Sequence, residues 1–421
     1  MKAYKKRIAD AALSEALKVF GALVIEGARA VGKSTTAAHV AASGVSLDSS
    51  PELAALAQTS PGTVLAGKVP RLIDEWQLAP AVWNAARHEV DQRGRAGQFI
   101  LTGSAAPTDD ITRHSGAGRF GRIRLRTMSL SETGDSTADV NFRSLFSKNA
   151  KVAALGGPDI PGIARLITKG GWPSLAGKTQ KQATLWLQGY LEDTARLDID
   201  GSGNRERVKA LIRALARNLS TETAISNLMT ESQIENTGAP PGAPVSTPTV
   251  RKYLDALTRI FVLEELPPWS THIRSKVRQR TSPKWHFVDP SLAAAALGVD
   301  ADKLLSEPRT LGLFFESLAI RDLRIYAGAL GGTVSYYRDE TGLEIDAIAE
   351  LPNGKCAAFE IKLGGETRIA EGADNLKKLR AKLDETRRRD LMSLNIITAG
   401  TTSRTRDDSV NIIALGHMTV A

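Results

Sequence analysis

Short apolar runs alternate with helix-type patterns along the first 150 residues of the chain. The runs cover residues 22–26, 45–48, 71–75, 98–104 and 122–125, and helix-type patterns between them include 33–43 and 81–93. Strands that alternate with helices in this way are typical of a parallel sheet with crossover helices. The pattern therefore predicts an α/β domain over residues 1–150.

A helical pattern replaces this alternation in the middle of the chain. Apolar residues recur at helical spacing over residues 183–193, 207–219 and 247–263. The segment 236–248, rich in proline and glycine, separates the last two and is typical of a surface loop. The pattern predicts a helical domain over residues 151–285.

The last part of the chain mixes both periods. A helical pattern at 312–327 precedes strand patterns at 333–339, 343–350, 357–363 and 394–398. The tripeptide Pro352-Asn353-Gly354 between two of these strands is a hairpin signal. We predict a mixed α/β domain over residues 286–421, which makes three domains in all.

Length and composition agree with this division and add a charge. At about 150 residues per domain, 421 residues correspond to about three domains. A hydrophobic share of 42% and a charged share of 24% exclude a disordered chain. Lys and Arg number 55 against 46 Asp and Glu, and the resulting net charge of +9 allows a polyanionic partner such as nucleic acid.

Cysteine usage and hydropathy indicate a cellular location. The single Cys356 excludes an intramolecular disulfide and a cysteine-based zinc site, and it favours a reducing compartment. Asp10, Glu15 and Lys18 interrupt the stretch that would be uncharged in a signal peptide. Since no run reaches the roughly 18 apolar residues of a membrane helix, we expect a soluble, cytoplasmic protein with no membrane contact.

A phosphate-binding motif follows the first predicted strand. Residues 27–34 fit G-x-x-x-x-G-K-[ST] between a strand and a helical run, a context that a chance glycine turn would lack. Backbone amides at the glycines surround phosphate oxygens, Lys33 reaches the outer phosphates and Ser34 ligates Mg²⁺. We predict that ATP is bound by Gly27, Ala28, Arg29, Ala30, Val31, Gly32, Lys33, Ser34 and Thr35.

Two later strands end in side chains that suit nucleotide hydrolysis. Asp74 is predicted to hold Mg²⁺, and Glu75 to activate the attacking water as general base. Thr102, before Ser104, can orient that water or sense the γ-phosphate, although a Thr-Gly-Ser turn explains it equally well. Solvated strand ends often carry carboxylates, so this interpretation depends on the phosphate-binding motif.

Three arginines follow the fourth predicted strand. Arg113, Arg119 and Arg122 lie near a glycine pair, and a guanidinium there can stabilise the charge of a transferring phosphoryl group. We take Arg119 as the candidate catalytic arginine. A solvated basic face is the alternative for each of the three.

The order of these motifs resembles a known family. The segments IEGARAVGKSTTA, LIDEWQLAP, FILTGSAAP and HSGAGR, and later GGWPSL, LEELPPW, KWHFVDPSL and GLFFESLA, are similar to prokaryotic AAA-like P-loop ATPases of the AAA+ superfamily. The C-terminal half of that family is a domain of unknown function. Thr127 departs from the family pattern, which usually has proline there.

The resemblance implies a fold for each part of the chain. It implies an AAA-type ATPase core, a helical linker and winged-helix-like domain over 151–285, and a C-terminal domain similar to the PD-(D/E)XK nuclease fold. Oligomeric assembly is common in the wider superfamily, and no residue of this sequence tests it. The long loop at 236–248 departs from the expected winged-helix geometry.

Acidic and basic residues on neighbouring strands suggest a second site. Glu360 and Lys362 are two apart on one predicted strand and share a face, and Asp346 lies on the strand before the hairpin. Carboxylates so placed can hold Mg²⁺ while lysine activates water. Glu316 is a fourth member by resemblance. A surface Glu–Lys pair, or a fold kept for binding without cleavage, is the alternative.

Two segments suggest contact with nucleic acid. Residues 249–257 are amphipathic and precede a strand-like segment, which suits a helix-turn-helix with a wing as well as an ordinary packed helix. A basic run that can follow a phosphate backbone, or form a solvated loop, comprises Arg274, Lys276, Arg278, Arg280 and Lys284.

These motifs lead to two expected functions of different classes. The first is a Mg²⁺-dependent ATPase of AAA type coupled to a C-terminal DNA-binding, nuclease-like module. The alternative is an ATP-dependent regulatory or toxin-like switch that binds a protein partner and carries an inert nuclease fold. A kinase-like transferase is disfavoured, because Asp74 and Glu75 suit water activation and no acceptor motif is present.

Overall fold

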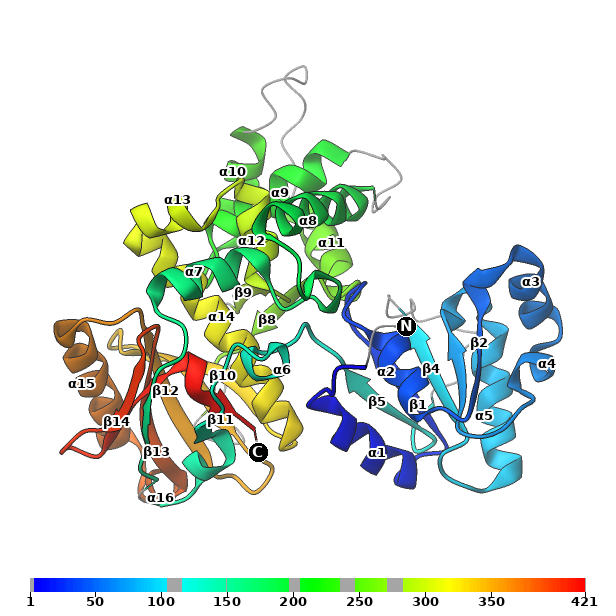
Figure 1. Cartoon of the computed structure of the whole chain (residues 1–421), viewed down its shortest axis with the longest axis horizontal. Coiled ribbons are helices and arrows are strands. Elements are labelled where there is room, and N and C mark those ends of the chain that lie inside the picture. Colours follow the sequence, from blue (N-terminus) through cyan, green and yellow to red (C-terminus); the bar gives the residue numbers. More distant parts are fainter. Residues whose placement is uncertain are drawn as a thin grey trace. The chain divides into compact units, whose positions relative to one another are not determined.

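A computed structural model describes residues 4–103, 116–148, 150–196, 205–234, 247–270 and 283–420. These residues form two compact units (Figure 1). The first unit is Met1–Thr127 with Arg259–Val262, and the second is Met128–Thr258 with Leu263–Ala421.

The first unit contains a five-stranded parallel sheet with strand order β2-β3-β4-β1-β5. The strands are β1 (Ala22–Glu26), β2 (Ser43–Ser46), β3 (Arg71–Asp74), β4 (Phe99–Gly103) and β5 (Phe120–Arg124). The predicted parallel α/β sheet is thus confirmed for this unit. Parallel strands all end at one edge, and that edge carries the candidate site.

One helix precedes β1, and the others lie between successive strands. They are α1 (Ala9–Val19), α2 (Lys33–Val40), α3 (Pro51–Thr59), α4 (Pro61–Leu65) and α5 (Ala81–Arg93). The predicted helix at 81–93 is confirmed at both ends, and it stops at Arg93 because Gly94 adopts a left-handed conformation. The predicted helix at 33–43 ends earlier, at Val40, since Ser43 already pairs in β2.

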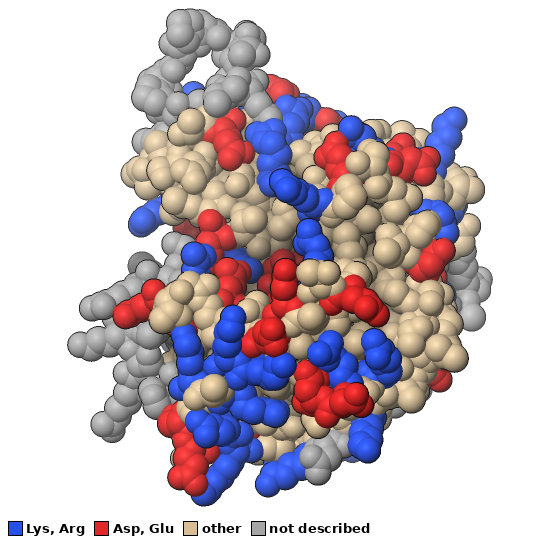
Figure 2. All heavy atoms as spheres, turned by 90° about the vertical axis from the view of Figure 1, so that its left-hand side faces the viewer, with Lys and Arg blue, Asp and Glu red and all other residues tan. Residues whose placement is uncertain are grey.

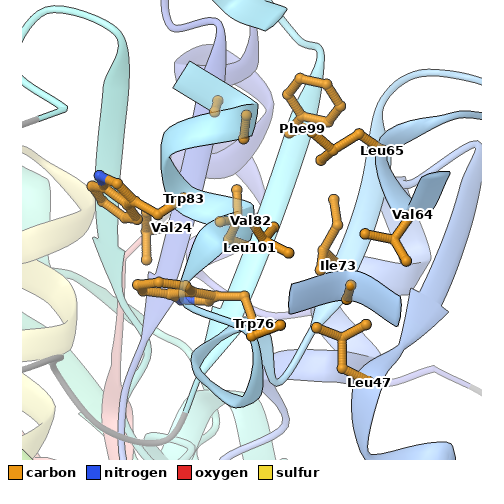
Figure 3. Close-up of a cluster of buried hydrophobic side chains, with 14 of the residues drawn as sticks. Val24, Leu47, Val64, Leu65, Ile73, Trp76, Val82, Trp83, Phe99 and Leu101 are labelled. Carbon is orange, nitrogen blue, oxygen red and sulfur yellow. The ribbon is translucent and has the colours of Figure 1, made fainter. Parts of the chain in front are cut away.

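Two tryptophans dominate the core of the first unit. Trp76 and Trp83 are buried with ring centroids 5.0 Å apart, and they lie among side chains of the sheet such as Ile73 and Leu101 (Figure 3). Full burial of one such aliphatic side chain contributes about 1.5–3 kcal/mol. This packing holds β1, β3 and β4 in fixed register beneath the loops that follow them.

The second unit contains a seven-stranded mixed sheet with strand order β10-β11-β12-β13-β15-β14-β7. The strands are β7 (Ala153–Leu155), β10 (Thr333–Arg338), β11 (Glu344–Glu350), β12 (Cys356–Lys362), β13 (Leu391–Thr398), β14 (Thr402–Thr405) and β15 (Val410–Ala414). The predicted hairpin at Asn353-Gly354 joins β11 to β12 in antiparallel register. Helices α14 (Pro308–Ala329) and α15 (Glu366–Lys382) pack against this sheet.

Among the remaining helices of the second unit, α7 to α13 form a mostly helical part, whereas α6 and α16 lie apart from it beside strands (Figure 1). They are α6 (Leu130–Thr133), α7 (Ile160–Lys169), α8 (Gln180–Ala195), α9 (Arg205–Arg217), α10 (Ile225–Ile234), α11 (Thr247–Arg259), α12 (Pro290–Leu297), α13 (Ala301–Ser306) and α16 (Glu385–Asp390). Two short pairs complete the unit: β8 (Leu263–Leu266) with β9 (Lys284–Phe287), and β6 (Val140–Asn141) with β16 (Met418–Thr419).

The first unit ends at Thr127, whereas the sequence predicts a boundary at residue 150. The difference arises because β6 pairs with β16 and β7 pairs with β14, which ties residues 140–155 to the end of the chain. Such long-range pairing leaves no signal in local hydrophobic patterns. The helical and C-terminal segments lie in one compact unit, and their division at residue 285 stays a prediction.

Membrane insertion has no candidate in the described part of the chain. Within the ranges given above, no helix combines the length and the apolar content that a crossing of the bilayer requires. The longest is α14, whose 22 residues include Arg321, Asp322 and Arg324.

Candidate functional site

The phosphate-binding motif forms the turn between β1 and α2. Gly27 has φ +154°, and a Cβ atom there would lie 2.1 Å from the backbone oxygen of Leu125, so only glycine fits. Gly32, with φ +97°, precedes the first residue of α2. Left-handed backbone at Gly32 turns the chain directly into the helix, and Lys33, Ser34 and Thr35 follow in its first turn.

Lys33 lies inside this turn. Its Nζ donates to the carbonyl oxygens of Gly27 at 2.9 Å and Ala28 at 2.8 Å, and the residue is only 4% exposed. Burial lowers the pKa of Lys33 to about 8, against the opposing effect of the carboxylates of Glu75 and Asp74. The ammonium of Lys33, which is predicted to bind phosphate, is therefore desolvated. Two backbone carbonyls hold it at the loop, and a phosphate can replace them.

Asp74 is hydrogen-bonded to two other predicted site residues. Ser34 Oγ donates to Asp74 Oδ1 at 2.8 Å, and Thr102 Oγ1 donates to the same oxygen. The structure thus brings together side chains from α2, β3 and β4. Ser46, at the end of β2, donates to Asp74 Oδ2 at 3.3 Å and was not predicted. The sequence signal for Ser46 is a polar residue at the end of a strand. Because β2 pairs in parallel with β3, the two strands end at the same edge of the sheet.

Glu75 follows β3 in a left-handed conformation, with φ +53°. The sequence predicts that the strand continues through this residue, but the left-handed turn ends it at Asp74. A non-glycine residue held in this region costs about 1–3 kcal/mol, and such strain clusters at functional sites. Gln77 Nε2 donates to Glu75 Oε2, while Gln77 Oε1 is buried without a hydrogen-bond partner. Sequence reasoning did not single out Gln77.

The predicted catalytic arginine lies elsewhere. Arg119 precedes β5, and Ala22 at the start of β1 pairs with Phe120, so Arg119 lies at the edge of the sheet opposite the phosphate-binding turn. Its Nε donates to Asp91 of α5 at 2.9 Å. Within one chain the structure therefore does not bring Arg119 to the phosphate-binding turn, because Arg119 precedes β5 whereas the turn follows β1 and the two strands run parallel. Its role as catalytic arginine stays a prediction. Arg122 pairs instead with Glu26, and Arg113 and Ser104 lie outside the described residues.

The lowered pKa of Lys33 predicts how nucleotide affinity depends on pH. Between pH 8 and 10.5 the folded protein binds fewer protons at Lys33 than the unfolded chain, so the contribution of this residue to stability rises with pH while its charge is lost. Because phosphate needs the charged form, we expect ATP affinity to fall by up to about tenfold per pH unit above pH 8. Equilibrium binding of a fluorescent ATP analogue from pH 6.5 to 9.5 measures it.

Lys33→Met supplies the control for this pH profile. Its weaker affinity is expected to be flat over the same pH range, since no titrating ammonium remains. A wild-type affinity that does not change between pH 7 and 9.5 would contradict the prediction.

The predicted second site gathers on adjacent strands of the second unit. Ala347 of β11 pairs with Phe359 of β12, which places Asp346 and Glu360 next to each other along the ladder. Lys362 Nζ lies 3.0 Å from Asp346 Oδ2 and 2.5 Å from Glu360 Oε2. The three predicted residues therefore form one ion cluster whose two carboxylates are buried, and the surface Glu–Lys pair considered as an alternative is not what is observed.

The fourth predicted member, Glu316, pairs with a residue assigned to another role. Lys284 Nζ lies 3.3 Å from Glu316 Oε1 and 2.5 Å from Glu344 Oε1, with its side chain 4% exposed. The sequence interpretation placed Lys284 in a solvent-facing basic run. That placement is wrong, because β9 pairs with β8 and directs Lys284 toward carboxylates of α14 and β11. The other four members of the run lie outside the described residues.

Burial and the two lysines shift the pKa values of this cluster in opposite directions. Burial raises the pKa of Glu316 and of Glu360 above the usual range of a carboxyl group. Burial would also raise the pKa of Asp346, but Lys362 and Lys284 lower it below its usual value. The pKa of Lys284 is raised although burial opposes it, because Glu316, Asp346 and Glu344 surround it.

The two sites differ in how well they suit a divalent cation. Ser34 and Asp74 offer hard oxygen atoms 2.8 Å apart, the donor type that Mg²⁺ prefers beside nucleotide phosphates. In the second unit, each predicted carboxylate ligand is already within ion-pair distance of a lysine. Over the part of the chain that the structure describes, no group of three or more His, Cys, Asp or Glu is arranged to hold a metal ion.

Basic residues gather on one face of the second unit. Figure 2 shows Lys and Arg concentrated in its lower part with acidic side chains among them. In the same unit, helices α15 and α16 are rich in basic residues along their sequences and carry Lys377, Lys378, Arg380, Lys382, Arg387, Arg388 and Arg389. Several are paired with carboxylates, including Lys377 with Asp408 and Lys382 with Asp339. Positive side chains therefore dominate this face, and nearby carboxylates neutralise several of them.

Comparison with known proteins divides the chain into three segments. Residues 20–134 match the family model of an AAA domain. Residues 161–303 and 311–418 match two models of domains of unknown function, DUF8612 and DUF4143. The uncharacterized proteins Mb2031c of Mycobacterium bovis and Rv2008c of Mycobacterium tuberculosis are each 27% identical over 364 residues, which cover 85% of this chain and 74% of theirs.

The comparison with solved structures matches, among others, two proteins at low identity. The Walker-type ATPase of Pyrococcus abyssi is 14% identical, with a TM-score of 0.44 over 68% of this chain and 94% of that one. The ORC2 protein of Aeropyrum pernix is 11% identical, with a TM-score of 0.30 over 73% and 90%. Together with the parallel sheet and its phosphate-binding turn, the family match shows that residues 20–134 form a P-loop domain of AAA type.

Proposed function

We propose that the chain binds ATP and hydrolyses it in a Mg²⁺-dependent reaction at the P-loop. The observation that carries this proposal is the meeting of Ser34, Asp74 and Thr102 through hydrogen bonds beside the buried ammonium of Lys33. A turn that served only as a structural connection would not need these polar groups from three separate elements at one edge of the sheet.

Each side chain has a role in this reaction. Ser34 and Asp74 would hold Mg²⁺, which supplies charge stabilisation at the β- and γ-phosphates when bound. Lys33 donates to the outer phosphate oxygens in place of the carbonyls of Gly27 and Ala28. Glu75 accepts the proton of the attacking water, and the hydrogen bond from Gln77 holds its carboxylate in place.

Phosphate release from ATP tests the proposal. The wild-type chain is expected to release phosphate with Mg²⁺, and Lys33→Ala and Glu75→Gln are expected to lose release for different reasons, the first through binding and the second through turnover. Release that is unchanged in both variants would overturn the proposed ATPase.

For the second unit we propose a DNA-binding, nuclease-like module. The juxtaposition of Asp346, Glu360 and Lys362 on neighbouring strands supports it, and so does the basic face over α15 and α16. The ion pairs of Lys284 and Lys362 occupy the carboxylates, so these residues do not fit a metal ion in the observed arrangement. An ATP-dependent switch with an inert nuclease fold, bound to a protein partner, is the second candidate, and the occupied carboxylates favour it. The lone buried Cys356 fits a cytoplasmic setting for either.

Cleavage assays distinguish these candidates. Linear, supercoiled and branched DNA is incubated with the protein and Mg²⁺ or Mn²⁺. If the module is a nuclease, Asp346→Asn and Lys362→Met are expected to lower cleavage at least tenfold, whereas Glu371→Ala, an exposed change on α15, leaves it unchanged.

Binding completes the comparison. DNA binding without cleavage in every variant supports an inert module that still contacts DNA. Absence of both binding and cleavage at low salt, with all variants folded by circular dichroism, would contradict the DNA-binding proposal and favour the switch.

A further inference from the structure

The N-terminal segment of the first unit contacts the P-loop through a buried arginine. Arg7 is 5% exposed, and its Nη1 donates to the carbonyl oxygen of Val31 at 2.8 Å. Val31 is the P-loop residue directly before Gly32. The proposed ATPase mechanism assigns no role to Arg7, and a buried guanidinium is costly unless its donors are satisfied. The burial of Arg7 against the P-loop therefore indicates a role that the ATPase mechanism does not include.

The second contact of Arg7 reaches the end of the sheet. Its Nη2 donates to the carbonyl oxygen of Arg126 at 2.8 Å, two residues after β5. Leu125, next to Arg126, donates to Glu26 at 2.7 Å and lies against Gly27. One guanidinium thus joins the P-loop to the segment that leaves β5. The chain passes from the first unit into the second at Thr127 and Met128, directly after this segment.

The bond to Val31 fixes the orientation of a phosphate-binding amide. In a planar trans peptide the C=O and N–H groups point in opposite directions. Because the Val31 oxygen faces Arg7, the N–H of Gly32 faces away from Arg7. A rotation of this peptide that brought the Gly32 N–H to a phosphate oxygen, or took it away, would move the acceptor of Arg7.

Neighbouring contacts hold Arg7 itself in place. Its backbone N–H donates to Asp10 Oδ2 at 2.8 Å, and the hydroxyl of Tyr4 donates to Asp10 Oδ1 at 2.6 Å. The ring of Tyr4 stacks on His39 of α2, with centroids 4.0 Å apart and planes 17° apart. The segment is therefore anchored on α2, the helix that begins with Lys33, as well as on α1.

We infer that Arg7 is a positioning residue that couples nucleotide binding at the P-loop to residues 126–128, where the chain enters the second unit. The inference rests on the proposed nucleotide binding and adds the route by which occupancy is transmitted. Bound ATP fixes the orientation of the Val31–Gly32 peptide. Arg7 moves with the Val31 oxygen that it binds, and the Arg126 carbonyl moves with Arg7. A ligand transmits a change only through such differential contacts.

Hydrogen–deuterium exchange with mass spectrometry tests the coupling. In the wild type, a non-hydrolysable ATP analogue with Mg²⁺ is expected to slow exchange both in the P-loop and in peptides that cover 125–130. Arg7→Met is expected to bind the analogue about tenfold more weakly. At saturation it protects its P-loop but no longer protects 125–130. Lys6→Met, which removes an exposed cation of the same segment, serves as matched control and behaves as wild type.

Further variants and the nucleotide-free protein separate the possible failures. Arg7→Lys keeps the charge but cannot span two carbonyls, so it is expected to recover affinity more than coupling, and it carries the test if Arg7→Met does not fold. Protection of 125–130 in a saturated Arg7 variant equal to that in wild type would overturn the inference. If wild type binds no nucleotide, the proposed function fails. In that case faster exchange of Gly32 and 125–130 in nucleotide-free Arg7→Lys still supports the link, and unchanged exchange overturns it.

Discussion

Replacement of Glu75 by glutamine is expected to lower kcat for ATP hydrolysis by about 10²–10⁴-fold while ATP remains bound. Glutamine keeps the size of the side chain and can still contact Gln77, but it cannot accept a proton from water. In the proposed mechanism Glu75 binds neither the phosphates of ATP nor Mg²⁺. We therefore expect the affinity for ATP to change less than threefold. Steady-state phosphate release and equilibrium binding of a fluorescent ATP analogue measure the two quantities separately.

Glu52→Gln provides a matched control for this result. Glu52 is exposed on α3, and its replacement removes the same charge without touching the site. Its kcat is expected to equal that of wild type. A Glu75→Gln protein with at least half of wild-type turnover would remove Glu75 from the reaction and leave the attacking water to another base.

Replacement of Lys33 by methionine is expected to weaken ATP binding by about 10- to 100-fold. A hydrogen bond to a charged group contributes about 1.5–3 kcal/mol, and 1.4 kcal/mol corresponds to a factor of ten. Methionine fills the same buried space without an ammonium, so the melting temperature should fall little or even rise, because a desolvated charge has been removed. Isothermal titration calorimetry with MgATP measures the loss.

The control for Lys33 is Lys68→Met, an exposed lysine of the same unit. It is expected to bind ATP as wild type does, which separates the contribution of Lys33 from that of net charge. Equal affinity in Lys33→Met and wild type would show that phosphates do not contact the P-loop lysine, and the proposed binding site would be wrong.

The P-loop unit follows local sequence patterns closely. Each of the five predicted strands is present, and α5 has its predicted ends because glycine after the last helical residue stops it. Shifts at other ends have local causes. β3 ends one residue early since Glu75 turns left-handed, and β2 ends at Ser46 because Leu47–Ser49 forms a short 3₁₀ helix. The periodicity of apolar residues predicts which segment is buried, but it does not predict the backbone angle φ of a single residue.

The candidate site could be predicted where chemistry follows strand ends. Asp74 and Thr102 meet because parallel strands end at one edge, a rule that needs only the strand assignment. The same rule explains why Arg119 does not lie at this edge in one chain, because Arg119 comes before its strand and so lies at the other edge. Gln77 and Arg7 escaped notice because a lone glutamine after a strand and a lone arginine before a helix have no motif.

The sequence by itself determined the P-loop and the alternation that makes a parallel sheet, because both are local: one depends on a fixed spacing of glycines, lysine and serine, and the other on a short period of apolar residues. Tertiary structure decided where distant residues meet. Lys284, which the sequence places in a basic surface run, pairs with Glu316. Residues 140–155 pair with strands near the end of the chain. Arg7 lies between Val31 and Arg126. Contacts between residues so far apart in sequence depend on strand pairing and helix packing, which local periodicity does not encode.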